Sequence, residues 1–271
     1  MLNSEVIFVA ARLAVTVAFL TYASWSDFKT REVSNRVWVI YAPIAVALTL
    51  AELLIYASSQ LVLFGVSVGI TVGLAFLLFY SGGFGGADSK ALMCIALALP
   101  FAPTVFQPIF GGFSPISKLI FPITIFSNAV LFAAASGVYM VFRNVVWHKK
   151  YGRKTFPDSL RHESAWKKIL VLITGYKVAT EKVKEKWHIF PMEDIEAGNE
   201  NALQRKLVVV PHDEGRDKIV ERLSAAAQAG KIDTYVWATP GLPMLIFITL
   251  GLIVALLFGD AVWVLVRFVL S

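Results

Sequence analysis

The chain has 271 residues, of which 57% are hydrophobic and 16% are charged, and its formal net charge is +6. Its mean hydropathy of +0.66 exceeds that of ordinary soluble domains, in which about 45–50% of residues are apolar. The apolar residues gather in long runs and most charged residues in one stretch, which is the pattern of a membrane protein. In such a chain an excess of Lys and Arg reflects helix orientation, so we expect no nucleic-acid partner.

The cysteine and histidine content excludes two other classes of site. Cys94 is the only cysteine, so the chain has neither an intrachain disulfide nor a CxxC pair for zinc. The four histidines match no spacing of metal ligands. We therefore expect no metal and no other cofactor.

Six apolar segments approach the roughly 20 residues that a helix needs to cross a membrane. They cover 5–26, 37–57, 61–81, 88–100, 116–146 and a last segment from Pro243 to Asp260, which the apolar run 261–270 follows. The first segment has no basic residues before it and is too long for a signal peptide, so we expect it to be retained. The sequence predicts an all-α polytopic membrane protein with six transmembrane helices.

A polar stretch at 147–239 interrupts this pattern and predicts a small α+β insert. Trp166, Ile169, Leu170 and Ile173 form a helical stripe. Segments 207–210 and 231–237 are predicted strands, and 215–229 a helix. The expected domains are 1–146 with five helices, the cytoplasmic insert 147–239, and 240–271 with the last helix. So small an insert is expected to lean on the membrane part or on lipid headgroups.

The Lys and Arg residues predict the orientation. Three of the 25 lie between the first two spans, one follows the third span, and eighteen lie from Arg143 to Lys231. Loops rich in Lys and Arg are cytoplasmic. We therefore expect a multi-pass protein of the plasma membrane with both termini outside the cell.

This orientation brings two aspartates to the same depth. Asp27 ends the first span, which runs inward, and Asp88 begins the fourth span, which starts from the inside. Singly, Asp27 is typical of a solvated residue beyond a helix, and Asp88 of a helix N-cap. As neighbours, two carboxylates share a proton and can activate a water for peptide hydrolysis without a metal or a covalent intermediate. The glycines at 82–86 let a substrate strand approach Asp88, or form a flexible loop.

Several motifs resemble those of the prepilin peptidases, a family of GxGD membrane aspartyl proteases. Gly85-Gly86-Ala87-Asp88-Ser89-Lys90 is similar to the GGAD form of their archaeal members. The segment from Ser26 to Asn35 resembles the family's other aspartate motif. The segment Trp237–Pro243 resembles the W-x-T-P-x-I-P entry to the last span of archaeal preflagellin (prearchaellin) peptidases, and Gly259-Asp260 also fits that span.

The resemblance implies the site residues and the reaction. Asp27 and Asp88 would be the catalytic pair, with Ala87 in place of the strict pattern's glycine. Residues that would shape the site or bind substrate are Asn35, Gly85, Gly86, Ala87, Lys90, Thr239, Pro240 and Pro243. The implied activity is removal of the short basic leader of type IV pilin-like or archaellin precursors at the cytoplasmic face. Bacterial relatives that also N-methylate carry two CxxC pairs, so their absence predicts cleavage without methylation.

Two alternatives use the same aspartates differently. A presenilin-like intramembrane protease would hold them deep in the bilayer, whereas Asp27 has polar neighbours. A proton- or cation-coupled transporter would need a polar path across the membrane, for which Arg12 and Glu52 are the candidates in the outer half. We expect those two side chains to reach the outer interface by snorkelling.

Overall fold

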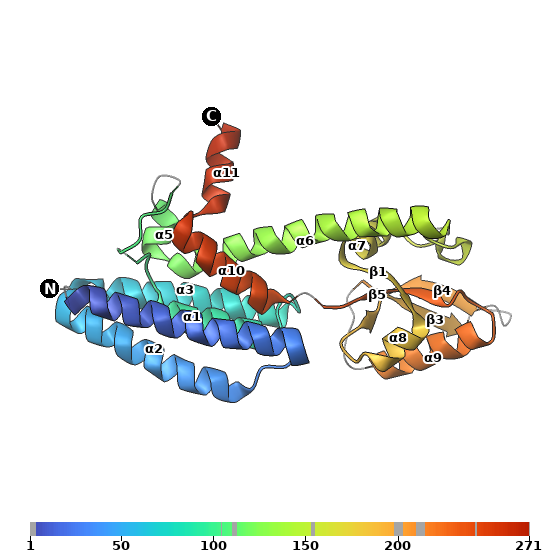
Figure 1. Ribbon diagram of the computed structural model, residues 1–271, viewed down its shortest axis with the longest axis horizontal. Helices are drawn as coiled ribbons and strands as arrows, with labels where there is room; N and C mark the ends of the chain where they lie inside the picture. The colour runs from blue at the N-terminus through green and yellow to red at the C-terminus, as the bar shows by residue number, and fades with distance from the viewer. Residues whose placement is uncertain are drawn as a thin grey trace. The chain divides into compact units, whose positions relative to one another are not determined.

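The computed structural model describes residues 4–103, 105–109, 113–152, 155–197, 203–209, 215–241 and 243–270. It divides into two compact units (Figure 1): Met1–Ala133 with Pro243–Ser271, and Ala134–Leu242. We call the first the helical unit and the second the mixed unit. The predicted division into membrane and cytoplasmic domains goes beyond this description and stays a prediction.

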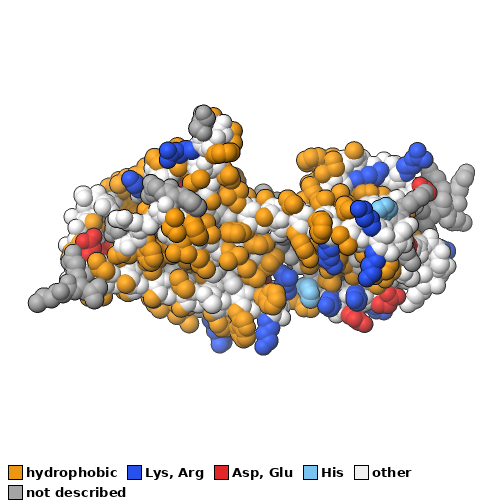
Figure 2. Space-filling model, turned by 45° about the horizontal axis from the view of Figure 1, so that its top comes forward, with side chains coloured by type: hydrophobic (Ala, Val, Ile, Leu, Met, Phe, Trp, Pro, Cys, Tyr) orange, Lys and Arg blue, Asp and Glu red, His pale blue; other side chains and the backbone are white. Residues whose placement is uncertain are grey.

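The helical unit is built from helices of very different lengths, of which the longest are strongly apolar. They are α1 (Ser4–Thr30), α2 (Asn35–Tyr56), η1 (Ser58–Gln60), α3 (Leu61–Tyr80), α4 (Gly86–Ala98), α5 (Pro115–Leu119), the start of α6 (Phe121–Tyr151), α10 (Met244–Leu257) and α11 (Ala261–Leu270). Its core contains side chains of α1, α2, α3, α4, α6 and α10. On the face drawn in Figure 2, hydrophobic side chains dominate this unit, whereas Lys and Arg are denser on the mixed unit.

Fewer helices are long enough to cross a membrane than the six that the sequence predicts. In the described chain, four helical segments are long and apolar enough to cross: 4–30, 35–56, 58–80 and 121–151. The pair α10 and α11, bent by 65°, would make a fifth if it is one broken span. The predicted fourth span is only the 13-residue α4, which is about 20 Å long and shorter than an apolar layer of about 30 Å. Six crossings therefore stay a prediction.

Polar side chains inside the helical unit bind the backbone where α4 ends. Arg12 donates to the carbonyl of Ala98 at 3.1 Å, Thr49 donates to the carbonyl of Leu97 at 2.8 Å, and Ser67 donates to that of Pro100 at 2.9 Å. The last carbonyls of a helix have no partner within the helix, and leaving them bare in an apolar environment is costly. These contacts explain how so short a helix ends inside the bundle.

The expectation that Arg12 and Glu52 snorkel is wrong. Both residues are 8% exposed, and the Arg12 guanidinium lies 2.7 Å from the Glu52 carboxylate. The two charges neutralise each other within the bundle instead of reaching water. Arg12 and Glu52 were the candidates for the outer half of a transporter path. They are instead bound to each other, and Arg12 also to the Ala98 carbonyl.

The mixed unit combines helices with two small antiparallel sheets, as the predicted α+β insert requires. One sheet has the order β1 (Tyr176–Ala179), β5 (Tyr235–Thr239), β2 (Phe190–Pro191), and the other pairs β3 (Glu193–Ala197) with β4 (Leu203–Leu207). The helices are the rest of α6, η2 (Asp158–Leu160), α7 (Ala165–Thr174), α8 (Thr180–Glu185) and α9 (Arg216–Gln228).

The predicted elements of the mixed unit match in kind but differ at their ends. α9 lies within the predicted helix 215–229 and is one residue shorter at each end. β4 ends at Leu207, where strand 207–210 was expected to begin; Val208 still donates its N–H to the carbonyl of Met192 at 2.9 Å, and residue 210 lies outside the described residues. β5 starts four residues later than predicted, because Gly230, with φ +66, and the Lys231 N–H close the end of α9 first.

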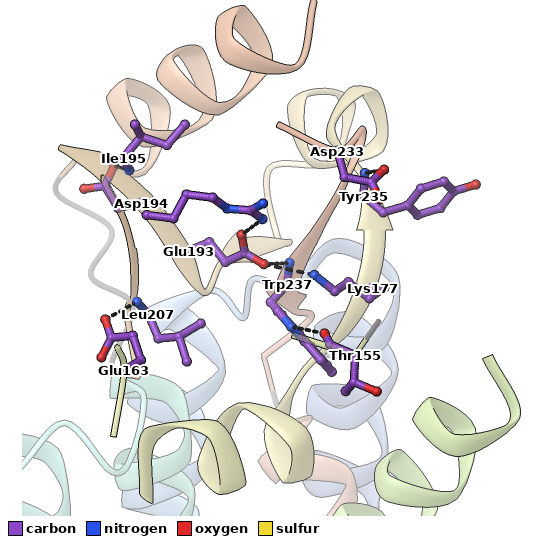
Figure 3. Close-up of polar contacts among 11 residues, drawn as sticks. Thr155, Glu163, Lys177, Glu193, Asp194, Ile195, Leu207, Asp233, Tyr235 and Trp237 are labelled. Carbon is purple, nitrogen blue, oxygen red and sulfur yellow. Dashed lines mark hydrogen bonds and ion pairs between the residues drawn. The ribbon is translucent and has the colours of Figure 1, made fainter. Parts of the chain in front are cut away.

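A buried ionic cluster holds the sheet region together (Figure 3). The Glu193 carboxylate is fully buried and accepts from Lys177 at 3.1 Å, from Arg205, and from the Trp237 N–H at 2.9 Å. Burial raises the pKa of Glu193, but the two cations and these hydrogen bonds outweigh it and hold the pKa below its ordinary value. The carboxylate is therefore charged, and it links β1, β3, β4 and β5.

Candidate active site

Asp27 lies inside α1, in the last turn of that helix, rather than just beyond it. It is one turn after Ala23, which is fully buried, so Asp27 extends the inward face of α1 toward the polar end. The helix closes immediately afterwards, where Arg31 donates its N–H to the Asp27 carbonyl at 2.9 Å and adopts φ +58. The Asp27 side chain is itself partly exposed, which suits a group that must meet water.

Asp88 lies in the first turn of α4. Its Oδ2 accepts the N–H of Gly85 at 3.1 Å, which is a capping contact at the helix start. The N-cap position belongs to Gly85, so the sequence-based interpretation of Asp88 as the N-cap is off by three residues. The contact fixes the orientation of the carboxyl group, and the described residues give Oδ1 no hydrogen bond.

The glycines before Asp88 have separate tasks. Gly82, with φ +75, turns the chain after α3. A Cβ on Gly85 would lie 3.1 Å from Asp88 Oδ2, so a side chain there would crowd the carboxyl group. A Cβ on Gly86 would make only an ordinary contact with Phe79. Ala87 is partly buried, and its methyl group packs against the apolar core.

The two aspartates interact. Asp27 is near enough for its charge to act on Asp88, and α1 packs against α4 within the helical unit. The carboxyl groups thus come from two helix ends at the same end of the bundle. Such an arrangement of carboxyls, one of them fixed by a backbone N–H, can share a proton and hold a water molecule.

Asn35 and Lys90, both predicted to shape the site or bind substrate, meet in the structure. The Lys90 ammonium donates to Asn35 Oδ1 at 2.6 Å, and both side chains are exposed. The contact ties the start of α2 to the start of α4, two residues after Asp88. It is a contact between sequence neighbours of the two aspartates.

Pro243 also belongs to the helical unit, next to α1. It directly precedes α10, where its carbonyl accepts the N–H of Ile246 at 3.0 Å. Ser24 of α1 donates to the carbonyl of Leu245 at 2.9 Å, so the start of α10 meets the end of α1 that carries Asp27. Thr239 ends β5 in the mixed unit and Pro240 follows it; their contribution to the site stays a prediction.

Comparison with known proteins shows what the chain is similar to. The family model of the type IV leader peptidase family matches residues 14–141, which include both aspartates. A second model, the type II C-terminus of archaeal A24 peptidases, matches residues 167–261. The two models together show that most of the chain is similar to type IV leader peptidases and their archaeal members. These matches and the long apolar helices support a membrane protease, and the predicted resemblance to archaeal prepilin and preflagellin peptidases is confirmed.

Two curated members of the family match nearly the whole chain. A preflagellin peptidase of Methanococcus voltae is 24% identical over 260 residues, covering 92% of this chain and 95% of the relative. A preflagellin peptidase of Methanococcus maripaludis strain C6 is 25% identical over 259 residues, covering 90% and 93%. The similarity therefore includes the mixed unit as well as the helices.

The sequence did not reveal the contacts that hold the site in place. The Arg12–Glu52 pair and the Thr49 and Ser67 contacts join α1, α2 and α3 to the end of α4 that is opposite Asp88. Charged residues within apolar runs were the one available signal. Among the described residues, no three His, Cys, Asp or Glu side chains gather as a metal site would require.

Proposed function

We propose that this protein is an aspartic endopeptidase that removes the short basic leader from archaellin or type IV pilin-like precursors. The packing of α1, which carries Asp27 in its last turn, against α4, which carries Asp88 in its first turn, is the observation that carries the proposal. The names of the two Methanococcus relatives give the substrate class, since both are preflagellin peptidases. The precursor would be a single-span protein whose leader is kept in the cytoplasm by its positive charge.

The chemistry follows from a shared proton. When two carboxyl groups interact, one stays protonated while the other is charged. The charged member accepts a proton from a water molecule, and the water oxygen attacks the peptide carbonyl carbon. The protonated member donates to the carbonyl oxygen. Collapse of the tetrahedral intermediate breaks the C–N bond, and a proton passes to the leaving amine.

The residues around the pair support these roles. Because Gly85 holds Oδ2 of Asp88, Oδ1 would face the water or the substrate. The extended backbone at Gly85, with φ −71 and ψ 163, and the absence of side chains at Gly85 and Gly86 leave room for a substrate strand. The Lys90–Asn35 contact would hold the start of α4 next to the start of α2.

The orientation is part of the proposal. The Lys and Arg distribution favours the cytoplasmic face of the plasma membrane for the aspartates, with both termini outside. The single cysteine leaves the chain without CxxC pairs, so we propose cleavage without N-methylation of the product.

A cleavage assay in membranes tests the proposal. A precursor with a basic leader is incubated with wild type, Asp27→Asn and Asp88→Asn, because Asn keeps the shape of the side chain and cannot transfer the proton. Glu32→Gln is the matched control: it removes an exposed carboxylate five residues after Asp27. We expect wild type and Glu32→Gln to release the leader and both Asn variants to leave the precursor intact.

The outcomes separate the parts of the proposal. Cleavage by either Asn variant would refute the catalytic pair. Failure of wild type on a range of archaellin and pilin precursors would refute the substrate class. Mass spectrometry of the mature product checks its new N-terminus, where a methylated amine would contradict cleavage without methylation.

A further inference from the structure

Helix α7 turns its apolar side away from the core of the mixed unit. Trp166 is 67% exposed, Ile169 47% and Ile173 38%, and Leu170 lies on the same side. On the opposite side only Val171 is fully buried. A soluble amphipathic helix has the reverse arrangement, with its apolar stripe facing the core.

The lysines of α7 are held toward the body of the mixed unit. Lys167 pairs with Glu163 at 2.9 Å, and the other oxygen of Glu163 accepts the N–H of Leu207 at 2.7 Å. Lys168 donates to the carbonyl of Arg161 at 3.0 Å. Burial raises the pKa of Glu163, but these hydrogen bonds outweigh it and keep the pKa below its ordinary value. The charged groups of α7 are therefore satisfied within the unit, and its outward face is left apolar.

Exposed large hydrophobic side chains of the mixed unit are concentrated on α6 and α7. Among the described residues of this unit, every large hydrophobic side chain that is exposed belongs to these two helices, with the single exception of Trp187. On α6 they are Val138, Tyr139, Phe142, Val145, Val146 and Tyr151. Hydrophobic side chains also gather in Figure 2 at the upper edge of the part where Figure 1 draws these helices. A concentrated apolar surface of this kind marks an interaction site.

α7 packs against the part of α6 where that helix would leave the membrane. Asn144 donates to the carbonyls of Leu172 at 2.9 Å and Gly175 at 2.8 Å, and a Cβ on Gly137 would lie 2.8 Å from Ile173 Cγ2. α6 is one of the four helices able to cross a membrane. If its first residue marks the start of the apolar layer, about 30 Å of helix ends near residue 141.

The residues that follow on α6 are those of a membrane–water boundary. They include Arg143 and Trp147, and His148, Lys149 and Lys150 lie in the last turn of the helix. Aromatic and basic side chains are typical of this level. Gly137 lies before the expected boundary and Asn144 after it. The contacts of α7 with these two residues therefore place α7 at the level of the boundary.

We propose that α7 is an interfacial helix, whose apolar face of Trp166, Ile169, Leu170 and Ile173 enters the lipid headgroup region beside α6. A short helix with a Trp-containing apolar face and lysines on its other side binds a bilayer in its plane. The helix thereby ties the mixed unit to the membrane surface. The occupant is lipid because this face is continuous with a helix that itself crosses the bilayer.

Site-specific fluorescence in the full chain tests the proposal. The native Cys94 is buried, so a cysteine introduced by Ile169→Cys is the accessible thiol for an NBD label, and wild type carried through the labelling gives the background. Glu221→Cys, exposed on α9 of the same unit, is the matched control. Each protein is reconstituted in phosphatidylcholine–phosphatidylglycerol nanodiscs, with and without lipids that carry a nitroxide on the acyl chain.

We expect nitroxide lipids to reduce the emission of the label at 169 several-fold and to leave the label at 221 unchanged. Iodide in the buffer should show the opposite preference. Trp166→Cys provides a second position on the same face. Labels at 166 and 169 that iodide quenches as strongly as the label at 221 would overturn the proposal. Labels shielded from both quenchers would overturn it too, because the face would then be covered by protein, either the helical unit or a second copy.

Discussion

Replacing Glu193 by Gln should destabilise the buried ionic cluster of the mixed unit. The glutamine amide would keep the shape of the side chain, but Lys177 and Arg205 would lose the negative charge between them. Both cations are almost fully buried: their side chains are 5% and 4% exposed. Water therefore cannot replace the lost partner, and two positive charges would face each other across a neutral amide.

The expected cost is large for a single substitution. Removing one partner of a buried ion pair costs about 3–5 kcal/mol, because a charge is left buried and uncompensated. At about 1.4 kcal/mol for each factor of ten, the opening equilibrium of the sheet rises roughly 10²- to 10⁴-fold. The amide of Trp237, which donates to Glu193 from the central strand β5, should report this change directly.

Hydrogen exchange followed by mass spectrometry on the full chain measures it. We expect peptides that cover β5 and β1 to exchange faster in Glu193→Gln than in wild type. Glu185→Gln removes an exposed carboxylate from α8 and should leave these peptides unchanged. If the two variants exchange alike, the cluster does not hold the sheet, and the reasoning from burial is refuted.

Three further results are expected. Because its pKa is lowered in the folded state, Glu193 stabilises the mixed unit above the ordinary carboxylate pKa and loses this contribution as pH falls through the folded value; acid unfolding followed by hydrogen exchange should be less steep in Glu193→Gln. Arg12→Leu should lower the melting temperature in detergent more than Arg12→Leu combined with Glu52→Leu, since the single change leaves Glu52 charged and buried; equal losses would contradict this. Gly251→Ala should also lower it, because the Cβ would meet the Ile125 carbonyl and the Ala129 N–H, whereas Gly69→Ala on α3 meets nothing within 4 Å and should not.

The candidate site was predictable because its signals are local. The Asp88 motif requires small residues before the carboxyl group, and the structure gives the reason at Gly85, whose N–H binds Asp88 and whose Cβ would crowd it. The approach of Asp27 to Asp88 followed from the alternating direction of the helices. By contrast, the Asn35–Lys90 contact joins residues 55 positions apart, and nothing in the sequence paired them.

Charged residues away from the site were predicted less well. Arg12 and Glu52 both lie in apolar runs, and each alone suggests a side chain that reaches toward water. Whether an ion pair forms depends on which faces of α1 and α2 meet. The stripe on α7 was predicted as a helix, but the direction of that stripe depends on where the rest of the unit packs.

The sequence by itself determined the membrane character, the α+β insert, the two aspartates and their glycines, because hydropathy, periodicity and backbone freedom act over a few neighbouring residues. Tertiary structure alone decided that the end of α4 is bound by Arg12, Thr49 and Ser67. It also decided that Glu193 carries a buried charge and that α7 faces outward. These features arise from pairings between distant segments, whose energies depend on burial and distance, and neither quantity is present in the order of residues.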